Sequence, residues 1–147
     1  MRGNLSIRKG CAVVDLNDLE SELHPEPRFW IEPKDKDPRT ELQRVVSFRK
    51  QLALKAPHLR AVAIPNGGKR GWKAKAQAKA EGAAWGFPDL MILGGPIMAF
   101  LEFKNGKAMP ADHQIEWLNW LLDAGYPVAC VRTAEGALKV LREARLV

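Results

Sequence analysis

Two spacings of apolar residues alternate along residues 38–147. Apolar side chains recur every three or four positions over about 38–57, 73–84, 110–124 and after Thr133, which predicts helices. Short apolar runs over 59–65, 89–93, 97–104 and 126–131 predict strands. The predicted order is therefore α β α β β α β α. Strands alternating with helices in this way favour an α/β fold with a mixed central β-sheet flanked by helices.

The predicted helix boundaries rest on capping signals. Asp37 suits the N-cap of the first helix and Pro38 its first turn, while Thr133 suits the N-cap of the last. The Ala-rich helix over 73–84 is interrupted at Gly82, and its small residues would allow close packing. The apolar face predicted for the first helix is Leu42, Val45, Val46, Leu52, Ala53 and Ala56.

Residues 1–38 have a different pattern and are predicted to form an N-terminal arm in front of a single domain at 39–147. Repeated prolines between positions 25 and 38 favour extended or irregular backbone. "CAVVDL" fits a short strand. Phe29 and Trp30 are expected to dock the arm, either on the domain or on a second subunit.

Composition favours a protein with an anionic partner and argues against a zinc protein or a membrane protein. Lys plus Arg is 23 and Asp plus Glu is 17, a net charge of +6, which favours an anionic partner. Two distant cysteines with no CxxC spacing argue against a zinc site. The apolar runs are too short for a membrane span, and no sustained apolar run follows the first basic residues. We therefore expect a cytoplasmic protein.

The positive charge is concentrated in "NGGKRGWKAKAQAKA", residues 66–80, which holds no acid. Such a patch is typical of nucleic-acid contact, although a solvated Lys-rich helix face has the same composition. Asn66, Gly67 and Gly68 would form a turn that backbone and DNA can approach closely. The predicted DNA contacts are Asn66, Gly67, Gly68, Lys69, Arg70, Lys73 and Lys75.

Three charges interrupt the paired apolar strands 89–93 and 97–104. Glu102 and Lys104 are two residues apart and so share a face of their strand. A hairpin turn at Gly94-Gly95 would bring Asp89 level with Glu102. Two carboxylates at one height repel unless they share a cation, and oxygen ligands favour Mg²⁺ or Mn²⁺. Charges that mark strand ends are the simpler alternative for each residue taken singly.

Two polar residues on predicted helices point the same way. Glu41 is in line with Val45, Phe48 and Leu52, so it borders the buried stripe of the first helix. Gln114 aligns with the inward face of its own helix. An acid placed for the helix dipole and an amide bonded to backbone are the simpler readings of these two residues.

The motif formed by these residues resembles a known family. Pro88-Asp89 followed by Glu102-Phe103-Lys104 is similar to the PD-(D/E)xK signature of restriction-endonuclease-like nucleases. The surrounding "IPNGGKR", "GFPDL", "FLEFK" and "ADHQIEWLNWLLDAGYPVACVRT" resemble the virus-type replication-repair nuclease (VRR-NUC) domain, over about 41–142. Small stand-alone members of that family occur in phages and bacteria.

The resemblance implies a restriction-endonuclease-like core and Mg²⁺- or Mn²⁺-dependent cleavage of structured DNA. It implies metal ligands at Asp89, Glu102, the carbonyl of Phe103 and Glu41, with Lys104 and Gln114 as further catalytic residues. Stand-alone members are homodimers associated with Holliday-junction cleavage, which implies a role in DNA repair. We therefore expect the chain in the cytoplasm of a bacterial or phage-infected cell.

Two other functions fit parts of this pattern. A non-catalytic basic nucleic-acid-binding domain would use the lysines and leave the acids structural. A sequence-specific restriction-type endonuclease of the same fold would share the carboxylates and differ in its DNA preference. Nucleophilic serine or cysteine chemistry and a Walker loop have no matching motif in the chain.

Overall fold

A five-stranded mixed sheet forms the centre of the computed structural model, which describes residues 7–9, 12–14, 24–65 and 71–147. Its strand order is β3 (Trp30–Ile31), β7 (Val128–Val131), β6 (Ala99–Phe103), β5 (Leu90–Leu93) and β4 (Arg60–Ala63). β3 and β6 run parallel to β7, whereas β5 is antiparallel to both β6 and β4. The predicted α/β class with a mixed sheet is confirmed. Two further strands, β1 (Ile7–Lys9) and β2 (Ala12–Val14), form their own antiparallel pair.

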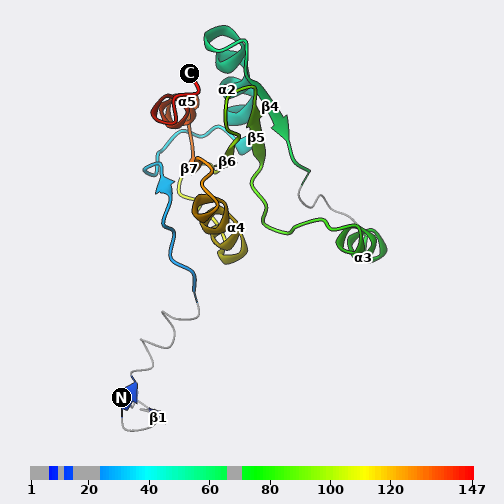
Figure 1. The fold of residues 1–147 in the computed structure, drawn as a ribbon, viewed down its shortest axis with the longest axis vertical. Coiled ribbons are helices and arrows are strands. Elements are labelled where there is room, and N and C mark those ends of the chain that lie inside the picture. Colours follow the sequence, from blue (N-terminus) through cyan, green and yellow to red (C-terminus); the bar gives the residue numbers. More distant parts are fainter. Residues whose placement is uncertain (1–6, 10–11, 15–23, 66–70) are drawn as a thin grey trace.

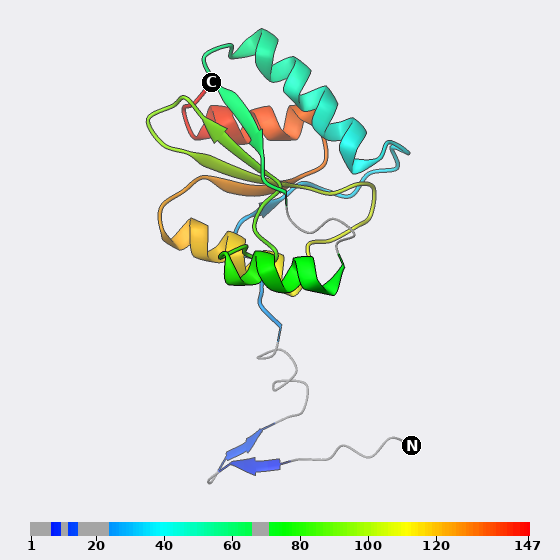
Figure 2. The ribbon, with the colours of Figure 1, turned by 90° about the vertical axis from the view of Figure 1, so that its right-hand side faces the viewer.

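Helices cover both faces of the sheet (Figures 1 and 2). Figure 2 shows α2 (Glu41–Lys55) and α5 (Ala134–Glu143) above the sheet and α4 (Asp112–Asp123) below it. Successive residues of β6 serve opposite faces: Leu101 and Phe103 pack toward α2 and α5, and Phe100 packs toward α4. In the described ranges no helix is long and apolar enough to cross a membrane.

α2 begins later than the capping signals predict. Its N-cap is Thr40, whose hydroxyl accepts the Gln43 N–H, while the Gln43 carboxamide oxygen accepts the Thr40 N–H. This reciprocal pair satisfies two helix-start donors together. Asp37, the predicted N-cap, instead accepts two hydrogen bonds from the Arg39 guanidinium. Pro38 consequently lies outside the helix.

The buried face of α2 also differs in part from the prediction. Phe48 and Leu52 are buried as expected, but Leu42 is 72% exposed and Val46 is also exposed. The buried stripe runs instead through Arg44, Phe48 and Leu52, and this stripe contains a charged residue. An arginine therefore occupies a core position that a purely apolar pattern does not predict.

Helix α3 (Trp72–Ala80) forms where predicted but does not pack closely. None of its residues is buried, and Figure 1 shows it standing apart from the sheet and the other helices. The chain turns at Gly82, which adopts a φ of +91° that favours glycine. The expectation that its small residues promote close packing is wrong, because no element of the described chain covers them.

The hairpin register of β5 and β6 agrees with the prediction. Leu90 pairs with Leu101 and Ile92 with Ala99, across a turn in which Gly94 has a φ of +108°. A side chain on Gly94 would overlap the His58 carbonyl, so the turn requires glycine there. The Thr133 cap of α5 is confirmed, since its hydroxyl accepts the Gly136 N–H at 2.9 Å.

Part of the predicted arm belongs to the sheet. Phe29 is 7% exposed within the apolar cluster around α4, and the next two residues form β3 beside β7. The Lys139 ammonium lies 4.3 Å from the centroid of the Trp30 ring. Arg28 forms a bidentate pair with Asp123 of α4. Of the two predicted docking partners for Phe29 and Trp30, the structure shows the domain of the same chain.

Candidate functional site

Strand register brings Asp89 next to Glu102. Because Leu90 faces Leu101, the next pair toward the strand end is Asp89 and Glu102. The Asp89 carboxylate accepts the Phe103 N–H at 3.0 Å, and its backbone carbonyl accepts the Ile64 N–H at 2.8 Å. Asp89 is thus held from both neighbouring strands, and the side-chain bond to Phe103 extends the β5–β6 ladder by one step.

Glu102 and Lys104 form an ion pair that is almost withdrawn from solvent. The Lys104 Nζ lies 2.9 Å from Glu102 Oε1, and the two side chains are 13% and 1% exposed, respectively. The predicted shared face of the strand therefore brings the two charges into contact. Charges that merely mark a strand end are normally solvated, so the burial of Glu102 speaks against that alternative.

Gln114 joins this pair from α4, the helix that covers the face of the sheet on which Phe100 and Glu102 lie. Its Nε2 donates to Glu102 Oε1 at 2.5 Å, and its Oε1 accepts the Ala111 N–H at 2.9 Å. The amide therefore caps the start of its own helix and orients the glutamate at the same time. Because both ends of the amide are bonded, Gln114 has a fixed orientation toward Glu102.

The electrostatics of the site follow from burying two acids beside one cation. Burial, and next the negative charge of Asp89, raises the pKa of Glu102 to about 7. Burial likewise raises the pKa of Asp89, although the Phe103 N–H and Lys104 oppose the shift. Burial disfavours the charged form of Lys104, but attraction from Glu102, Glu41 and Asp89 outweighs it and raises the lysine's pKa. Among the described residues, the site thus sets one lysine against two carboxylates.

The donor atoms of the site fit a hard divalent cation. Glu102 Oε2 is buried and has no hydrogen-bond partner among the described residues. The N–H and C=O of a strand residue point to the same neighbouring strand, so the Phe103 carbonyl lies on the side of Asp89. Two carboxylates and a carbonyl suffice for Mg²⁺, which keeps several water ligands. A cation bound at Glu102 Oε2 would satisfy this buried acceptor and so stabilise the site.

Glu41 lies at the edge of this arrangement. It is the first residue of α2 and is partly buried, and its negative charge helps to raise the pKa of Lys104. Within the described ranges, no group of three or more Asp, Glu, His or Cys side chains is arranged to hold a metal ion. The structure therefore brings Asp89, Glu102, Lys104 and Gln114 together and places Glu41 near the lysine, without making it a third member of a carboxylate cluster.

The predicted DNA contacts divide into two groups. Those at 66–70, namely Asn66, Gly67, Gly68, Lys69 and Arg70, lie outside the described residues. Lys73 and Lys75 are exposed on α3. Their role in DNA binding stays a prediction.

Sequence reasoning missed a buried polar cluster beside the site. The Arg44 guanidinium, fully buried, donates to both carboxylate oxygens of Asp35 and to the Arg132 carbonyl. Arg132 in turn donates to the carbonyls of Asn105 and Ala108, in the segment that follows Lys104. The cluster thus holds that segment in place. The sequence feature that indicates this cluster is the position of Arg44 in line with the buried Phe48 and Leu52 of α2.

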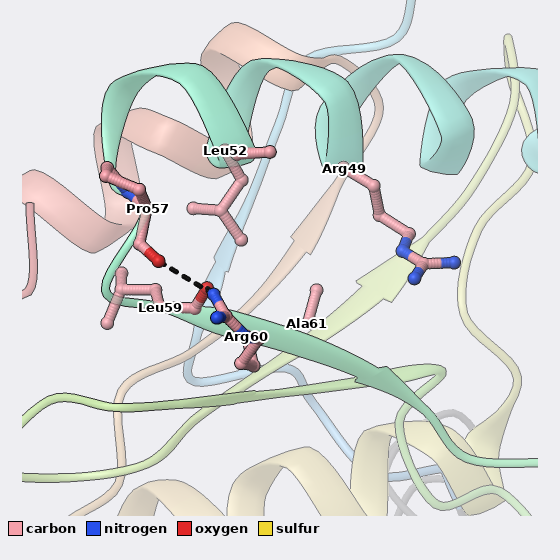
Figure 3. Close-up of a pocket in the computed structure, with 7 residues that line it drawn as sticks. Arg49, Leu52, Pro57, Leu59, Arg60 and Ala61 are labelled. Atoms are coloured by element: carbon pink, nitrogen blue, oxygen red, sulfur yellow. Dashed lines mark hydrogen bonds between the residues drawn. The ribbon is translucent and has the colours of Figure 1, made fainter.

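A separate groove lies between α2 and the edge strand β4 (Figure 3). Its lining includes Arg49, Leu52, Leu59 and Arg60, and Arg60 Nη1 donates to the Pro57 carbonyl at 2.7 Å. None of the predicted site residues lines it. We therefore assign the candidate chemistry to the carboxylates at the end of β5 and β6 and not to this groove.

Comparisons with protein-family models, curated proteins and solved structures give no match for this chain.

Proposed function

We propose that the chain is a Mg²⁺- or Mn²⁺-dependent DNA endonuclease with a restriction-endonuclease-like core, related to VRR-NUC nucleases. One observation carries the proposal. Glu102 is a buried carboxylate next to Asp89 and bonded to Lys104, and its second oxygen has no hydrogen-bond partner among the described residues. Such a group is costly in a purely structural role, because burying unpaired acceptors and like charges destabilises a fold.

The carboxylates and the Phe103 carbonyl are the groups that would hold the metal. When bound, Mg²⁺ or Mn²⁺ supplies a Lewis acid that polarises a phosphoryl oxygen and lowers the pKa of a water molecule. Asp89 is oriented by the Phe103 N–H, and Glu102 by Gln114 and Lys104. These bonds fix the ligands before any substrate arrives, which limits the reorganisation needed during hydrolysis.

Lys104 is the group in this set that can act on the reacting atoms. Its ammonium is held at the site by Glu102, with Glu41 and Asp89 adding attraction. From there it would orient the attacking water or neutralise charge on the phosphate. Hydrolysis adds the water oxygen to phosphorus and breaks one ester P–O bond, leaving a phosphate monoester and a hydroxyl.

Branched DNA of the Holliday-junction type is the substrate we propose, and a homodimer the active form. Both follow from the resemblance to VRR-NUC nucleases. A homodimer would present two such sites, one for each of two strands to be cut. The proposal fits the net charge of +6.

Cleavage assays test this function. Labelled four-way junction, flap and linear duplex are incubated with Mg²⁺, Mn²⁺ or EDTA. We expect metal-dependent cutting that Asp89→Asn and Lys104→Ala abolish, and that the control Lys107→Ala, at an exposed lysine three positions from Lys104, retains. Salt-sensitive binding with no cutting by any form would instead identify a non-catalytic binding domain. A fixed cut position on long duplex would identify a restriction-type enzyme.

A further inference from the structure

Helix α3 is a surface without a partner in the described chain. All of its residues are at least partly exposed, and alternate positions from Ala74 to Ala80 are alanine. A nine-residue helix without packing is only marginally stable in water by itself. A ligand that binds along such a helix would stabilise it.

The segment that contains α3 leaves and rejoins the sheet beside the carboxylates. Ala63, the last residue of β4, pairs with Leu90, the first residue of β5, and Leu90 pairs with Leu101 of β6. Asp89 and Glu102 are the next residues along this row. Both ends of the segment 64–89 are therefore anchored at the end of the sheet that carries the candidate site. Figure 1 shows the chain that follows α3 running back to β5 at that end.

The exposed side chains of this segment combine tryptophan with lysine. Trp72 is 76% exposed and Trp85 is 42% exposed, although large aromatic rings are normally buried. The Lys73 ammonium lies 5.9 Å from the Trp72 ring centroid, and the Lys75 ammonium lies 5.9 Å from that of Trp85. Each exposed ring therefore has a positive charge next to it.

The charge of α3 is uncompensated over most of its length. Its three lysines, Lys73, Lys75 and Lys79, have no acid among the residues of the helix. The nearest acid in sequence, Glu81, follows its C-terminus and accepts a hydrogen bond from Gln77. The complementary ligand is accordingly a polyanion.

We propose that α3 and Trp85 bind an unpaired DNA strand, with nucleobases stacked on Trp72 and Trp85 and phosphates beside Lys73 and Lys75. Exposed ring faces can stack on bases only where those bases are not already paired and stacked, which favours single-stranded DNA over duplex. Lysines interleaved with aromatic rings are the usual construction of such binding surfaces. Binding of an unpaired strand by α3 does not depend on the proposed nuclease function. Its consequence does rest on that function: the unpaired strand at a branch or flap would be held next to the carboxylates.

The test is DNA binding measured in EDTA, where no metal-dependent cutting occurs. Fluorescence anisotropy of a labelled oligo-dT strand gives the dissociation constant, and a duplex of equal length is the second ligand. We expect Trp72→Ala and Trp85→Ala each to weaken single-strand binding roughly fivefold or more, with little change for duplex. Trp72→Phe should retain most of the affinity. Trp120→Ala is the matched control, since Trp120 is 60% exposed but lies on α4.

Salt dependence separates the roles of the rings and the lysines. Replacing Lys73 and Lys75 by glutamine should lower the slope of log affinity against log salt by about 1.4, at about 0.7 for each single-strand phosphate contact. The two tryptophan variants should keep the wild-type slope. Equal binding of single strand by wild type and both tryptophan variants overturns the proposal, and so does an equal loss for duplex. A failure of cleavage with these binding results intact would refute the nuclease function alone.

Discussion

The ion pair between the buried Arg44 and the partly exposed Asp35 yields the sharpest stability prediction. Asp35→Ala removes two hydrogen bonds, of 2.6 and 2.8 Å, from a guanidinium that is 0% exposed. Breaking a fully buried ion pair costs about 3–5 kcal/mol. Asp35 is 26% exposed, and Arg44 keeps bonds to the carbonyls of Arg39, Asp37 and Arg132. We therefore expect a loss of about 2–3 kcal/mol in the free energy of unfolding.

Urea unfolding followed by circular dichroism measures this loss. The chain supplies a matched control in Asp123→Ala, which removes an equally bidentate pair with Arg28 in which both side chains are 55% exposed. Because solvent screens exposed pairs, this control should leave the unfolding midpoint unchanged within error. If Asp35→Ala shifts the midpoint no more than Asp123→Ala does, the buried cluster does not hold the fold as we infer.

Three further outcomes follow from the same structure. Hydrogen bonds from Arg44 are the main cause that lowers the pKa of Asp35 in the folded protein. The stabilisation by the pair is therefore present above the unfolded carboxyl pKa of about 3.9 and is lost as pH falls through the lower folded pKa. The difference in urea midpoint between wild type and Asp35→Ala should close below about pH 4 and stay constant between pH 5 and 7. Gly86→Ala should lower the free energy of unfolding measured in urea by about 1–3 kcal/mol, because Gly86 has a φ of +81° and an added Cβ would overlap His113. Gly125→Ala should lower it less, because Gly125 has a φ of +93° but open space around it. Gln114→Met should raise the Mg²⁺ concentration for half-maximal cleavage roughly 10- to 100-fold, since Glu102, the proposed metal ligand, loses its orienting bond; an unchanged requirement would exclude that role.

The hairpin at the candidate site could be predicted because local rules determine it. Pleat alternation sets which face Glu102 and Lys104 share, and a turn at Gly94 sets which residue faces Asp89. Both rules act over a few residues, so no long-range contact is needed to apply them. The structure agrees in register and face.

Some of the errors come from competing local signals, and others arise where residues distant in sequence decide the outcome. Asp37 has the local features of an N-cap, but it pairs with Arg39, and Thr40 with Gln43 starts the helix instead. β3 is only two residues long, and its pairing with β7 joins positions about a hundred residues apart. Arg44 can be buried because Asp35 and backbone carbonyls, among them the distant one of Arg132, compensate its charge.

We propose that Asp89 and Glu102 form a metal-dependent catalytic centre. Its most direct test is the single-turnover rate of four-way-junction cleavage in Mg²⁺, measured for wild type and Asp89→Asn at equal DNA occupancy. Loss of a metal worth several kcal/mol to the transition state predicts a rate lower by roughly 10²- to 10³-fold for the variant, and no product with EDTA. Equal rates for the two proteins, or cutting by wild type that persists in EDTA, would show that these carboxylates do not act through a metal.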